Sequence, residues 1–515
     1  MKLFVLGLDG ASYRLIHRFV EEEKLPSFKK LIKEGIFRKL KTTNPPHTAP
    51  GWTNAFTGVQ PGKHGIYQFW DTQSPNYYGE YMGSNHVGVP TVWEILNQFS
   101  YKTIMVNIPM TYPPKEVNGV MISWPLSNTL RYAYPKDMLF KIAKAGGHYA
   151  SDINIMFENN LEYISQAIEI TKKRVKTIDY FLKNGEWDLF ISVFTEIDRI
   201  SHYYWNFMDK SSPVYNHEVE EKYKLAIENI YRETDLALGK VLEMLPDDAL
   251  LMILSDHGFT VGEVDFYVQT FLMKHSLLAV KEIDKKSIKE NSWFYMKEAG
   301  KEYEVDWNQT TAYMASPGSY GVNINLKGRQ NNGIIEQEQY EQEREKIISL
   351  LKKILHPNKK TPLFRDVLKR EEVYAGEYLD KAPDIIMVPY EYSTMVHHKI
   401  HPDKIFGRPE QKGMHDKDAI FGLYGQNIQL KESGEIALED ITPTILNLFA
   451  IRTPSYMDGE SMIQFNDEQE NWKDFVISDE GSGGYKGEEA YTREEAYTRE
   501  ESQEVAEKLK SLGYL

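Results

Sequence analysis

The stretch Leu250–Gly258 reads LLMILSDHG, so five apolar residues run directly into a serine, an aspartate, a histidine and a glycine. A short continuous apolar run is typical of a strand that is buried on both faces of a parallel sheet. Two further runs end in the same way: Leu3–Leu8 leads into Asp9, and Leu189–Phe194 leads to Asp198. Because ligands bind at the carboxyl ends of such strands, we expect these acidic residues to converge on one crevice.

The rest of the chain repeats the alternation of apolar runs and helical patterns. Amphipathic or charged-faced helices are predicted at Leu25–Gly35, Leu161–Leu182 and Glu218–Leu245. Further buried strands are predicted at Thr103–Ile108, Val120–Trp124, Asp384–Val388 and Ile420–Leu423. Strands that alternate with helices predict an α/β fold with a mostly parallel central sheet and helices on both faces.

A change in amino-acid composition along the 515 residues predicts the domain organisation. We expect a core formed by residues 1–265 and 375–465, interrupted by an inserted cap at 266–374. The cap is more polar, with a strand pair near Ala312–Ser316 and Val322–Leu326 and a helix near Glu336–Leu355. Residues 466–515 form an acidic tail that repeats EEAYTR at 488–493 and 494–499 and ends in a predicted helix near Glu504–Leu512.

Composition excludes several classes of protein. The 60 Lys and Arg against 75 Asp and Glu give a net charge of −15, which argues against a nucleic-acid polymer as partner. The absence of cysteine excludes disulfides, thiolate ligands, cysteine nucleophiles and iron–sulfur clusters. No apolar run approaches the ~20 residues that span a bilayer, and the N-terminus lacks a signal-peptide pattern, so we expect no membrane span and a cytoplasmic location.

The acidic residues at the ends of these strands are the candidates for a functional site. Clustered carboxylates repel one another unless a cation lies between them, and Asp with His is the ligand set expected for Zn²⁺ or Mn²⁺. Each piece alone has a plain alternative: Asp9 could cap a helix, Asp198 and His202 could be a pair on one helix face, and Asp256-His257-Gly258 could be a turn. Three such ends together favour a metal site.

A candidate nucleophile lies in the loop Thr43–Gly65, which is dense in Pro, Gly, Thr and His. Thr48 stands where a helix could begin, followed by Ala49-Pro50. A hydroxyl at that position would meet unpaired N–H groups that hold an anion, and metal coordination would make its alkoxide accessible. The alternative is that Thr48 only caps the helix, with Pro50 in its first turn.

At this point the residues resemble a known family. The matching motifs are Asp9, Thr48-Ala49-Pro50, Thr57-Gly58, Pro61–Gly65 (PGKHG), Asp198-x-x-x-His202, Ser255–Gly258 (SDHG) and Gly413-Met414-His415. This set resembles the alkaline phosphatase superfamily, and within it the type I phosphodiesterase/nucleotide pyrophosphatase-like branch. The resemblance extends from residue 1 to about 465, apart from the insertion, and includes a group of predicted phosphohydrolases or phosphomutases.

The resemblance implies an alkaline-phosphatase-like three-layer sandwich with an inserted cap, and a site for two divalent metal ions, Zn²⁺ or Mn²⁺. It implies Thr48 as the nucleophile that forms a phospho-threonine intermediate. The ligands of one metal would be Asp9, Thr48, Asp256 and His257. The ligands of the other would be Asp198, His202 and His415.

Departures from the family's patterns narrow the range of expected substrates. Sulfatases need a Cys or Ser that becomes formylglycine, and this chain has no cysteine. Nucleotide pyrophosphatases usually carry an Asn just after the His-Gly-Ile of the nucleophile loop, where this chain has Tyr67–Phe69. Asn54, Lys63 and Arg199 lie near the motifs and are candidates for the missing phosphate contact. The histidine-rich patch of His397, His398 and His401 is expected to be a solvated loop rather than a metal site.

We therefore expect an enzyme, a metal-dependent phosphoesterase that cleaves phosphodiester or pyrophosphate bonds of a small-molecule substrate. The first alternative is a phosphomonoesterase or phosphomutase that uses the same site for a different reaction. A more distant alternative is a non-catalytic anion-binding module on the same fold. A homo-oligomer is possible on this sequence.

Overall fold

The computed structural model describes residues 1–476 except 127–128, 148, 153–160, 284–293, 299, 317, 426–429, 432–433 and 464–471. In the C-terminal region it describes Val505, Lys508 and Leu509. The repeated EEAYTR segment therefore lies outside the described residues. Within the described part, no helix is long and apolar enough to cross a membrane.

A nine-stranded sheet forms the core, in the order β21-β2-β20-β7-β1-β6-β3-β4-β5. Its central strands β7, β1, β6, β3 and β4 are parallel to their neighbours in that run. The strands are β1 (Lys2–Leu8), β2 (Ile36–Lys41), β3 (Thr103–Ile108), β4 (Gly119–Ser123), β5 (Ala133–Tyr134), β6 (Leu189–Phe194), β7 (Ala249–Leu254), β20 (Ala419–Tyr424) and β21 (Ile436–Ala437).

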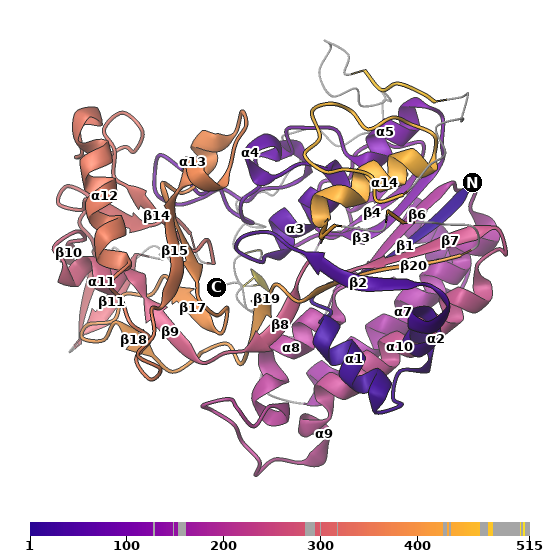
Figure 1. Ribbon diagram of the computed structural model, residues 1–515, viewed down its shortest axis with the longest axis horizontal. Coiled ribbons are helices and arrows are strands. Elements are labelled where there is room, and N and C mark those ends of the chain that lie inside the picture. The colour runs from indigo at the N-terminus through magenta and orange to yellow at the C-terminus, as the bar shows by residue number, and fades with distance from the viewer. Residues whose placement is uncertain are drawn as a thin grey trace.

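Helices cover both faces of this sheet, which makes the core a three-layer sandwich (Figure 1). One face carries α1 (Tyr13–Glu21), α2 (Pro26–Glu34), α6 (Met138–Lys144), α7 (Leu161–Asn184), α8 (Glu196–Met208) and α10 (Ala226–Met244). The other carries α3 (Thr48–Thr57), α5 (Val92–Gln98) and α14 (Ile441–Leu448). Short helical turns include α4 (Pro61–His64) and α9 (Glu221–Lys224).

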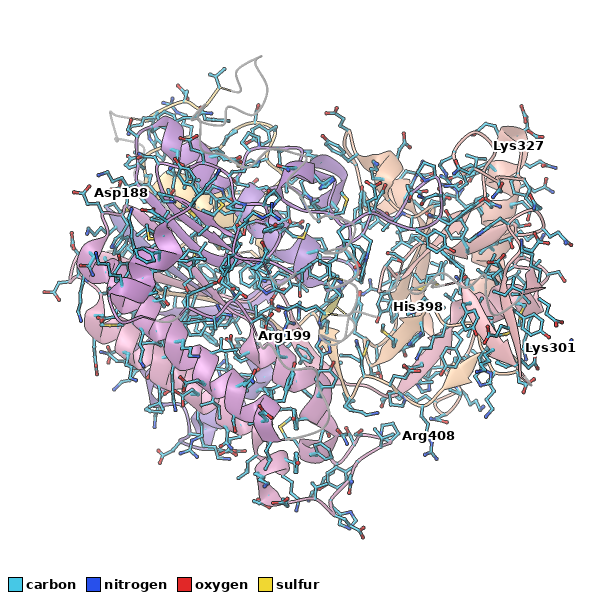
Figure 2. All side chains as sticks on the ribbon, turned by 180° about the vertical axis from the view of Figure 1, so that it is seen from behind. Asp188, Arg199, Lys301, Lys327, His398 and Arg408 are labelled. Carbon is cyan, nitrogen blue, oxygen red and sulfur yellow. The ribbon has the colours of Figure 1, made fainter. Side chains whose placement is uncertain are left out.

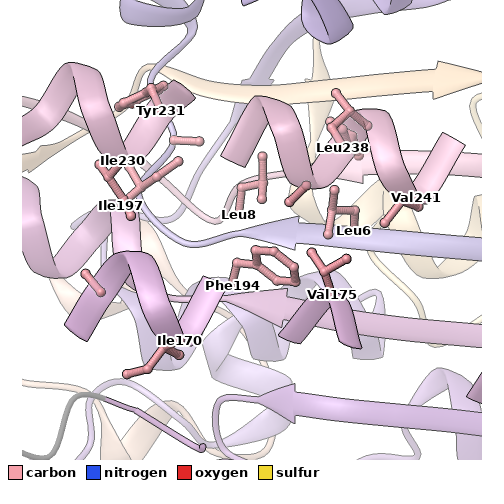
Figure 3. Packing of buried hydrophobic residues seen from close by; sticks show 14 of the residues in the cluster. Leu6, Leu8, Ile170, Val175, Phe194, Ile197, Ile230, Tyr231, Leu238 and Val241 are labelled. Carbon is pink, nitrogen blue, oxygen red and sulfur yellow. The ribbon is translucent and has the colours of Figure 1, made fainter. Parts of the chain in front are cut away.

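Strand β1 shows why the apolar runs are continuous. Leu6 and Leu8 point to the face covered by α7, α8 and α10, where Figure 3 shows them beside Phe194. Leu3 and Val5 point to the opposite face, beneath α3 and α14. Since successive side chains alternate between two apolar layers, every position of the strand has to be apolar.

A second group of strands, which we call the small-sheet region, covers residues 264–407 beside the core (Figure 1). It contains three sheets: β10-β12-β11, β13-β14-β16-β15 and β17-β9-β18. The strands are β9 (Val264–Tyr267), β10 (Val280–Ile283), β11 (Tyr295–Glu298), β12 (Lys301–Val305), β13 (Ala312–Met314), β14 (Gly321–Ile324), β15 (Phe364–Lys369), β16 (Ile385–Pro389), β17 (Thr394–His397) and β18 (Phe406–Gly407). Its helices are α11 (Val268–Lys274), α12 (Tyr340–Leu351) and α13 (Arg370–Val373).

The structure confirms the α/β class and corrects three element predictions. Strand β16, expected in the parallel sheet, pairs antiparallel with β14 and β15 in the small-sheet region. Strand β20 lies in the central sheet but runs antiparallel to β7. The helix expected at Glu218–Leu245 divides into α9 and α10. An apolar run indicates that a strand is buried, but it does not indicate which strand it pairs with or in which direction. The predictions for β16 and β20 were wrong for this reason. The domain boundaries at 265, 374 and 465 remain predictions.

Candidate active site

The three acidic strand ends meet as expected. Strand β1 lies between β6 and β7, and its last residues pair with the last residues of both neighbours. Asp9 follows β1, while Asp256 follows β7 after a single serine. Asp198 comes in the first turn of α8, directly after β6. All three carboxylates are fully buried at the carboxyl edge of the sheet.

Thr48 lies against the first group of these residues. It is the first residue of α3, and the side chain of His47 caps that helix by accepting a hydrogen bond from the Ala49 N–H. The Thr48 hydroxyl is 3.2 Å from His257 Nε2 and 3.5 Å from Asp9 Oδ1. His257 Nε2 is in turn 3.3 Å from Asp256 Oδ2 and 3.6 Å from Asp9 Oδ1. Helix α3 therefore presents its N-terminus and one hydroxyl to an Asp/His group.

Asp198, His202 and His415 form a second group next to the first. Asp198 Oδ1 lies 3.4 Å from His202 Nε2 and 3.2 Å from His415 Nε2. His415 lies on β19 (Gly413–Asp416), which pairs antiparallel with β8 (Gly258–Val261) directly after the β7 strand end. This antiparallel pair brings His415 to the carboxyl edge of the central sheet, although His415 lies about 160 residues after His257 in the sequence. Its ring stacks on that of His257 with centroids 3.6 Å apart.

The three histidines share one orientation. Each places Nδ1 within hydrogen-bond distance of a backbone carbonyl: Gly413 for His202, Gly258 for His257 and Pro46 for His415. A carbonyl accepts only, so Nδ1 carries the proton and Nε2 presents a lone pair. His202 Nε2 and His415 Nε2 then face each other at 3.0 Å as two lone pairs. A cation between them relieves that repulsion, and carbonyl-oriented imidazoles are usual for metal ligands.

The buried carboxylates also indicate that cations can bind here. Burial, together with the neighbouring carboxylates Asp256 and Asp198, raises the pKa of Asp9 well above its ordinary value. Burial and Asp198 do the same to the pKa of Asp256. Asp198 Oδ1 and Asp256 Oδ2 are buried and accept no hydrogen bond within the described part of the chain. Burial lowers the pKa of His257 and His415, which keeps both rings in the neutral form that binds metals. The two groups fit divalent cations.

Arg199, one of the three candidate phosphate contacts, lies beside this site. Its guanidinium is fully buried, pairs with Asp198, and lies 3.2 Å from Asp152 Oδ2. Figure 2 shows it where the core meets the small-sheet region. Asp152 also accepts a hydrogen bond from Trp124 Nε1 at 2.8 Å. Arg199 thus orients the carboxylate of Asp198, a candidate metal ligand, and direct contact with a substrate phosphate stays a prediction.

Asn54 and Lys63 are engaged elsewhere. Asn54 donates to Glu439 Oε1 at 2.8 Å and is 2.7 Å from His64 Nε2 through its Oδ1. Lys63 donates to Asp458 Oδ1 at 2.5 Å and to the Tyr456 carbonyl at 2.7 Å. These contacts tie α3 to the turn just before α14, and α4 to the segment after α14. A role for either residue in substrate binding remains a prediction.

A cavity opens from the second metal-ligand group toward the small-sheet region. Its walls combine site histidines with aromatic and sulfur-containing side chains from both parts of the molecule. The lining residues are Pro46, His47, His202, Gly318, Tyr320, Tyr392, Met395, Gln411, Met414 and His415. The cavity therefore has a metal-ligating floor and an apolar wall.

A third cluster, Asp265, His397 and Glu410, lies in and beside the β17-β9-β18 sheet. Here His397 Nδ1 accepts the Lys399 N–H, so Nε2 carries the proton and faces Glu410 Oε2 at 3.6 Å. The Lys399 ammonium pairs with the same oxygen at 2.5 Å. This orientation is opposite to that of the site histidines and is typical of an ion-pair cluster. The expectation of a solvated loop is wrong for His397, which is buried on β17, because its partners Asp265 and Glu410 are distant in sequence; the absence of a metal there remains a prediction.

Sequence reasoning missed several residues of the site. His47 lines the cavity and stands directly before Thr48, so its position next to the nucleophile was a usable signal. Trp52 donates to Asp9 Oδ2 at 3.2 Å, and its spacing of one helical turn from Thr48 places it on the same helix face. Asp152, Tyr320 and Tyr392 belong to no recognisable pattern, because they reach the site only through the folding of distant segments.

The comparisons with known proteins agree with this geometry. The family model for type I phosphodiesterase / nucleotide pyrophosphatase matches residues 3–418. No curated protein is significantly similar to the chain in sequence.

Solved structures share the fold at low identity. Phosphonoacetate hydrolase from Sinorhizobium meliloti 1021 has a TM-score of 0.52 and 13% identity, over 86% of this chain and 94% of its own. Human ectonucleotide pyrophosphatase/phosphodiesterase 5 has a TM-score of 0.51 and 14% identity, over 89% and 97%. The alkaline phosphatase PafA has a TM-score of 0.53 and 13% identity, over 89% and 98%. The chain is a hydrolase of phosphoric esters with an alkaline-phosphatase-like fold, and it belongs to the type I phosphodiesterase/nucleotide pyrophosphatase family.

Proposed function

We propose that the protein hydrolyses phosphodiester or pyrophosphate bonds of a small-molecule substrate, with Thr48 as the nucleophile. The observation that carries this is the pair of Asp/His groups around one helix N-terminal hydroxyl, with Thr48 Oγ1 3.2 Å from His257 Nε2. Asp9, Asp256 and His257 would hold one divalent ion together with Thr48, and Asp198, His202 and His415 would hold a second. Zn²⁺ or Mn²⁺ suits this set of oxygen and nitrogen ligands.

The reaction would proceed by two displacements at phosphorus. The Thr48 oxygen attacks, its proton passes to a base or to solvent, and the bond from phosphorus to the leaving alcohol or phosphate breaks. Water then attacks the phospho-threonine, releasing the phosphate product and restoring the hydroxyl. Bound divalent ions would lower the pKa of the attacking hydroxyl and neutralise charge on the leaving oxygen.

The chain's own residues would prepare both steps. Asp9 lies 3.5 Å from the Thr48 hydroxyl as an acceptor, and Trp52 orients that carboxylate through its other oxygen. The start of α3 places the Thr48 hydroxyl at the positive end of the helix dipole, which favours an anionic phosphoryl group there. Arg199 keeps Asp198 in position through the buried ion pair.

The cavity supports a substrate with an apolar or aromatic substituent. Tyr320, Tyr392 and Met395 come from the small-sheet region and face His202 and His415 across the cavity. A second ester group of a diester could rest on this wall while phosphorus stays at Thr48. A monoester would leave the wall without a partner, and for this reason we favour the diester.

Replacing Thr48 tests the covalent mechanism. We expect Thr48→Ala to lower turnover by about 10³-fold or more, because the nucleophile is lost, while Asp9, Asp256 and His257 still bind metal. Thr48→Ser keeps a hydroxyl and should retain activity within about 100-fold of the wild type. Full activity of Thr48→Ala, with bound metal unchanged, would make water the nucleophile.

Substrate class is tested with bis-p-nitrophenyl phosphate beside p-nitrophenyl phosphate. Metal-stripped protein is refilled in turn with Zn²⁺, Mn²⁺ and Mg²⁺, and kcat/KM is measured for both esters. Preference for the diester supports the proposal. Preference for the monoester would make the protein a phosphatase or mutase, and no turnover with any metal would favour a binding role.

A further inference from the structure

Lys417 lies beside the cavity of the candidate active site, two residues after His415. Side chains in an extended segment alternate between two sides, so His415 and Lys417 share one side while Asp416 points to the other. The contacts follow this alternation. Asp416 Oδ2 lies 2.9 Å from Arg14 Nη2 on α1, whereas Lys417 Nζ lies 5.2 Å from the centre of the Tyr392 ring.

Tyr392 connects this lysine with the cavity. Its ring lines the cavity together with that of His415. Its hydroxyl donates to Asn44 Oδ1, and His415 Nδ1 donates to the carbonyl of Pro46 in the same loop. Two residues of extended chain span at most about 7 Å, so the Cα atoms of His415 and Lys417 are no further apart than this. A cation therefore lies against the cavity wall, close to a candidate metal ligand.

The hydroxyl groups of the apolar wall are already used within the protein. The Tyr320 hydroxyl donates to the Thr394 carbonyl at 3.1 Å, and the Tyr392 hydroxyl donates to Asn44. The third member of the wall, Met395, carries a thioether. The wall thus presents ring surfaces and a sulfur atom, which suit the apolar part of a substituent. Recognition of a charge has to come from a neighbouring residue.

Lys417 is a partly buried cation whose neighbouring carboxylates are used elsewhere. In the part of the chain that the structure describes, no carboxylate forms an ion pair with its ammonium group. Asp416 and Asp418, on either side of it in the sequence, both pair with Arg14. Because a charge that loses part of its hydration needs a partner of opposite sign, an anion from outside the chain is favoured at this position.

We propose that Lys417 is a specificity-determining residue, which binds an anionic group carried by the ester substituent of the substrate. The apolar or aromatic part of the substituent rests on Tyr320, Tyr392 and Met395, and the anion beyond it pairs with the Lys417 ammonium. A carboxylate and a phosphate share this chemistry. The proposal rests on the proposed function, since it names the kind of substituent that the same site accepts.

The test compares three diesters of p-nitrophenyl phosphate that share the reacting phosphorus and the leaving group. The second ester group is phenyl, 4-carboxyphenyl or 4-phosphonophenyl, so that only the charge at the far end of the ring differs. The metal-loaded full chain is assayed as wild type, as Lys417→Met, which keeps an unbranched apolar side chain, and as Lys417→Arg, which keeps the charge. Lys33→Gln, at an exposed lysine of α2, is the control.

We expect Lys417→Met to lower kcat/KM about tenfold for the two anionic esters, mainly through KM, and to change it less than about twofold for the phenyl ester. Lys417→Arg should stay close to the wild type on all three esters, and Lys33→Gln should match it. A loss confined to the carboxylate or to the phosphonate ester would identify which anion the lysine binds. Equal effects of Lys417→Met on all three esters, or no effect on any, would overturn the proposal.

A binding measurement separates this proposal from the proposed function. Phenylphosphonate and 4-phosphonobenzoate contain no ester bond, and calorimetry gives their Kd for the metal-loaded wild type and Lys417→Met. The variant should bind 4-phosphonobenzoate about tenfold more weakly and phenylphosphonate almost unchanged. If the wild type hydrolyses no ester, the proposed function fails, and this selective loss of affinity still supports the anion site. Equal affinities in wild type and variant, or no binding at all, would overturn it.

Discussion

At the scale of single residues, the direction of each imidazole separates the histidines of the candidate active site from His397. His202, His257 and His415 turn Nδ1 to carbonyl oxygens and so present Nε2 lone pairs to the carboxylates. His397 accepts a backbone N–H at Nδ1 and so presents a proton to Glu410. The same residue type therefore has the orientation of a metal ligand in one cluster and that of a hydrogen-bond donor in the other.

Asp265 permits a prediction at this scale. Its side chain is buried, and burial raises its pKa to about 6, a change that His397 partly offsets. Because the folded pKa lies above the unfolded value of 3.8, the unfolded chain ionises first as pH rises, and the fold loses stability between about pH 4 and 6. Asp265→Asn cannot ionise and keeps an oxygen to accept the Glu410 N–H.

We expect Asp265→Asn to equal the wild type in stability near pH 4 and to exceed it at pH 7.5, by up to about 3 kcal/mol. Urea unfolding in the presence of EDTA at both pH values measures the difference. Asp247→Asn, at an exposed position, is the control and should show no such pH dependence. A stability difference that is equal at both pH values would contradict the prediction.

At the scale of elements, the β8–β19 pair completes the second metal-ligand group. Strand β19 crosses so close to α8 that a Cβ on Gly413 would lie 2.2 Å from the Ser201 carbonyl oxygen. That approach lets the Gly413 carbonyl accept from His202 Nδ1 at 3.1 Å and brings His415 beside His202. Glycine is needed here for the space between two backbones.

Gly413→Ala should therefore displace β19 and move His415 away from His202. We expect the protein to lose one of its bound metal ions and about 100-fold or more in kcat/KM, because a ligand leaves the site. Metal content by elemental analysis and activity on bis-p-nitrophenyl phosphate test this. Gly328→Ala is the control: with φ at +79° it also strains the backbone, but its Cβ meets nothing within 4 Å, so it should retain both. Full metal content in Gly413→Ala would refute the argument.

At the scale of the whole molecule, the core and the small-sheet region share the work at the cavity. The core supplies the candidate nucleophile and the Asp/His groups, and the small-sheet region supplies Tyr320, Tyr392 and Met395 of the apolar wall. Contacts between them include the Gln68 amide donating to the Gly318 carbonyl at 2.8 Å and the Tyr374 hydroxyl donating to the Asn44 carbonyl at 2.6 Å. We therefore expect chemistry and substrate preference to reside in different parts of the chain.

Tyr392→Ala tests this division. Removing a cavity-lining ring should raise KM for bis-p-nitrophenyl phosphate about 5- to 30-fold, the effect of 1–2 kcal/mol of lost apolar contact, and change kcat less. Methyl p-nitrophenyl phosphate can place its small methyl ester group against the wall instead of an aryl group. For this ester the rise in KM should be smaller. Tyr390→Ala, at a ring 61% exposed, is the matched control. Equal effects on both esters would show that the wall does not contact the substituent.

The sequence by itself determined the α/β core and the site's main residues. Continuous apolar runs mark buried strands, and parallel strands end at a common edge, so Asp9, Asp198 and Asp256 had to meet wherever those strands became neighbours. The family resemblance added His415 and the role of Thr48. Local pattern was sufficient for these residues because each lies within a few positions of a strand or helix end.

The tertiary structure alone decided what surrounds the site. The direction of β20 and the sheet to which β16 belongs depend on pairing between distant strands, which an apolar run does not encode. Asp152 and Tyr392 reach the site from segments with no catalytic motif. Such contacts are non-local: their energy comes from burying the residues together, and nothing in the sequence near any one of them specifies its partners.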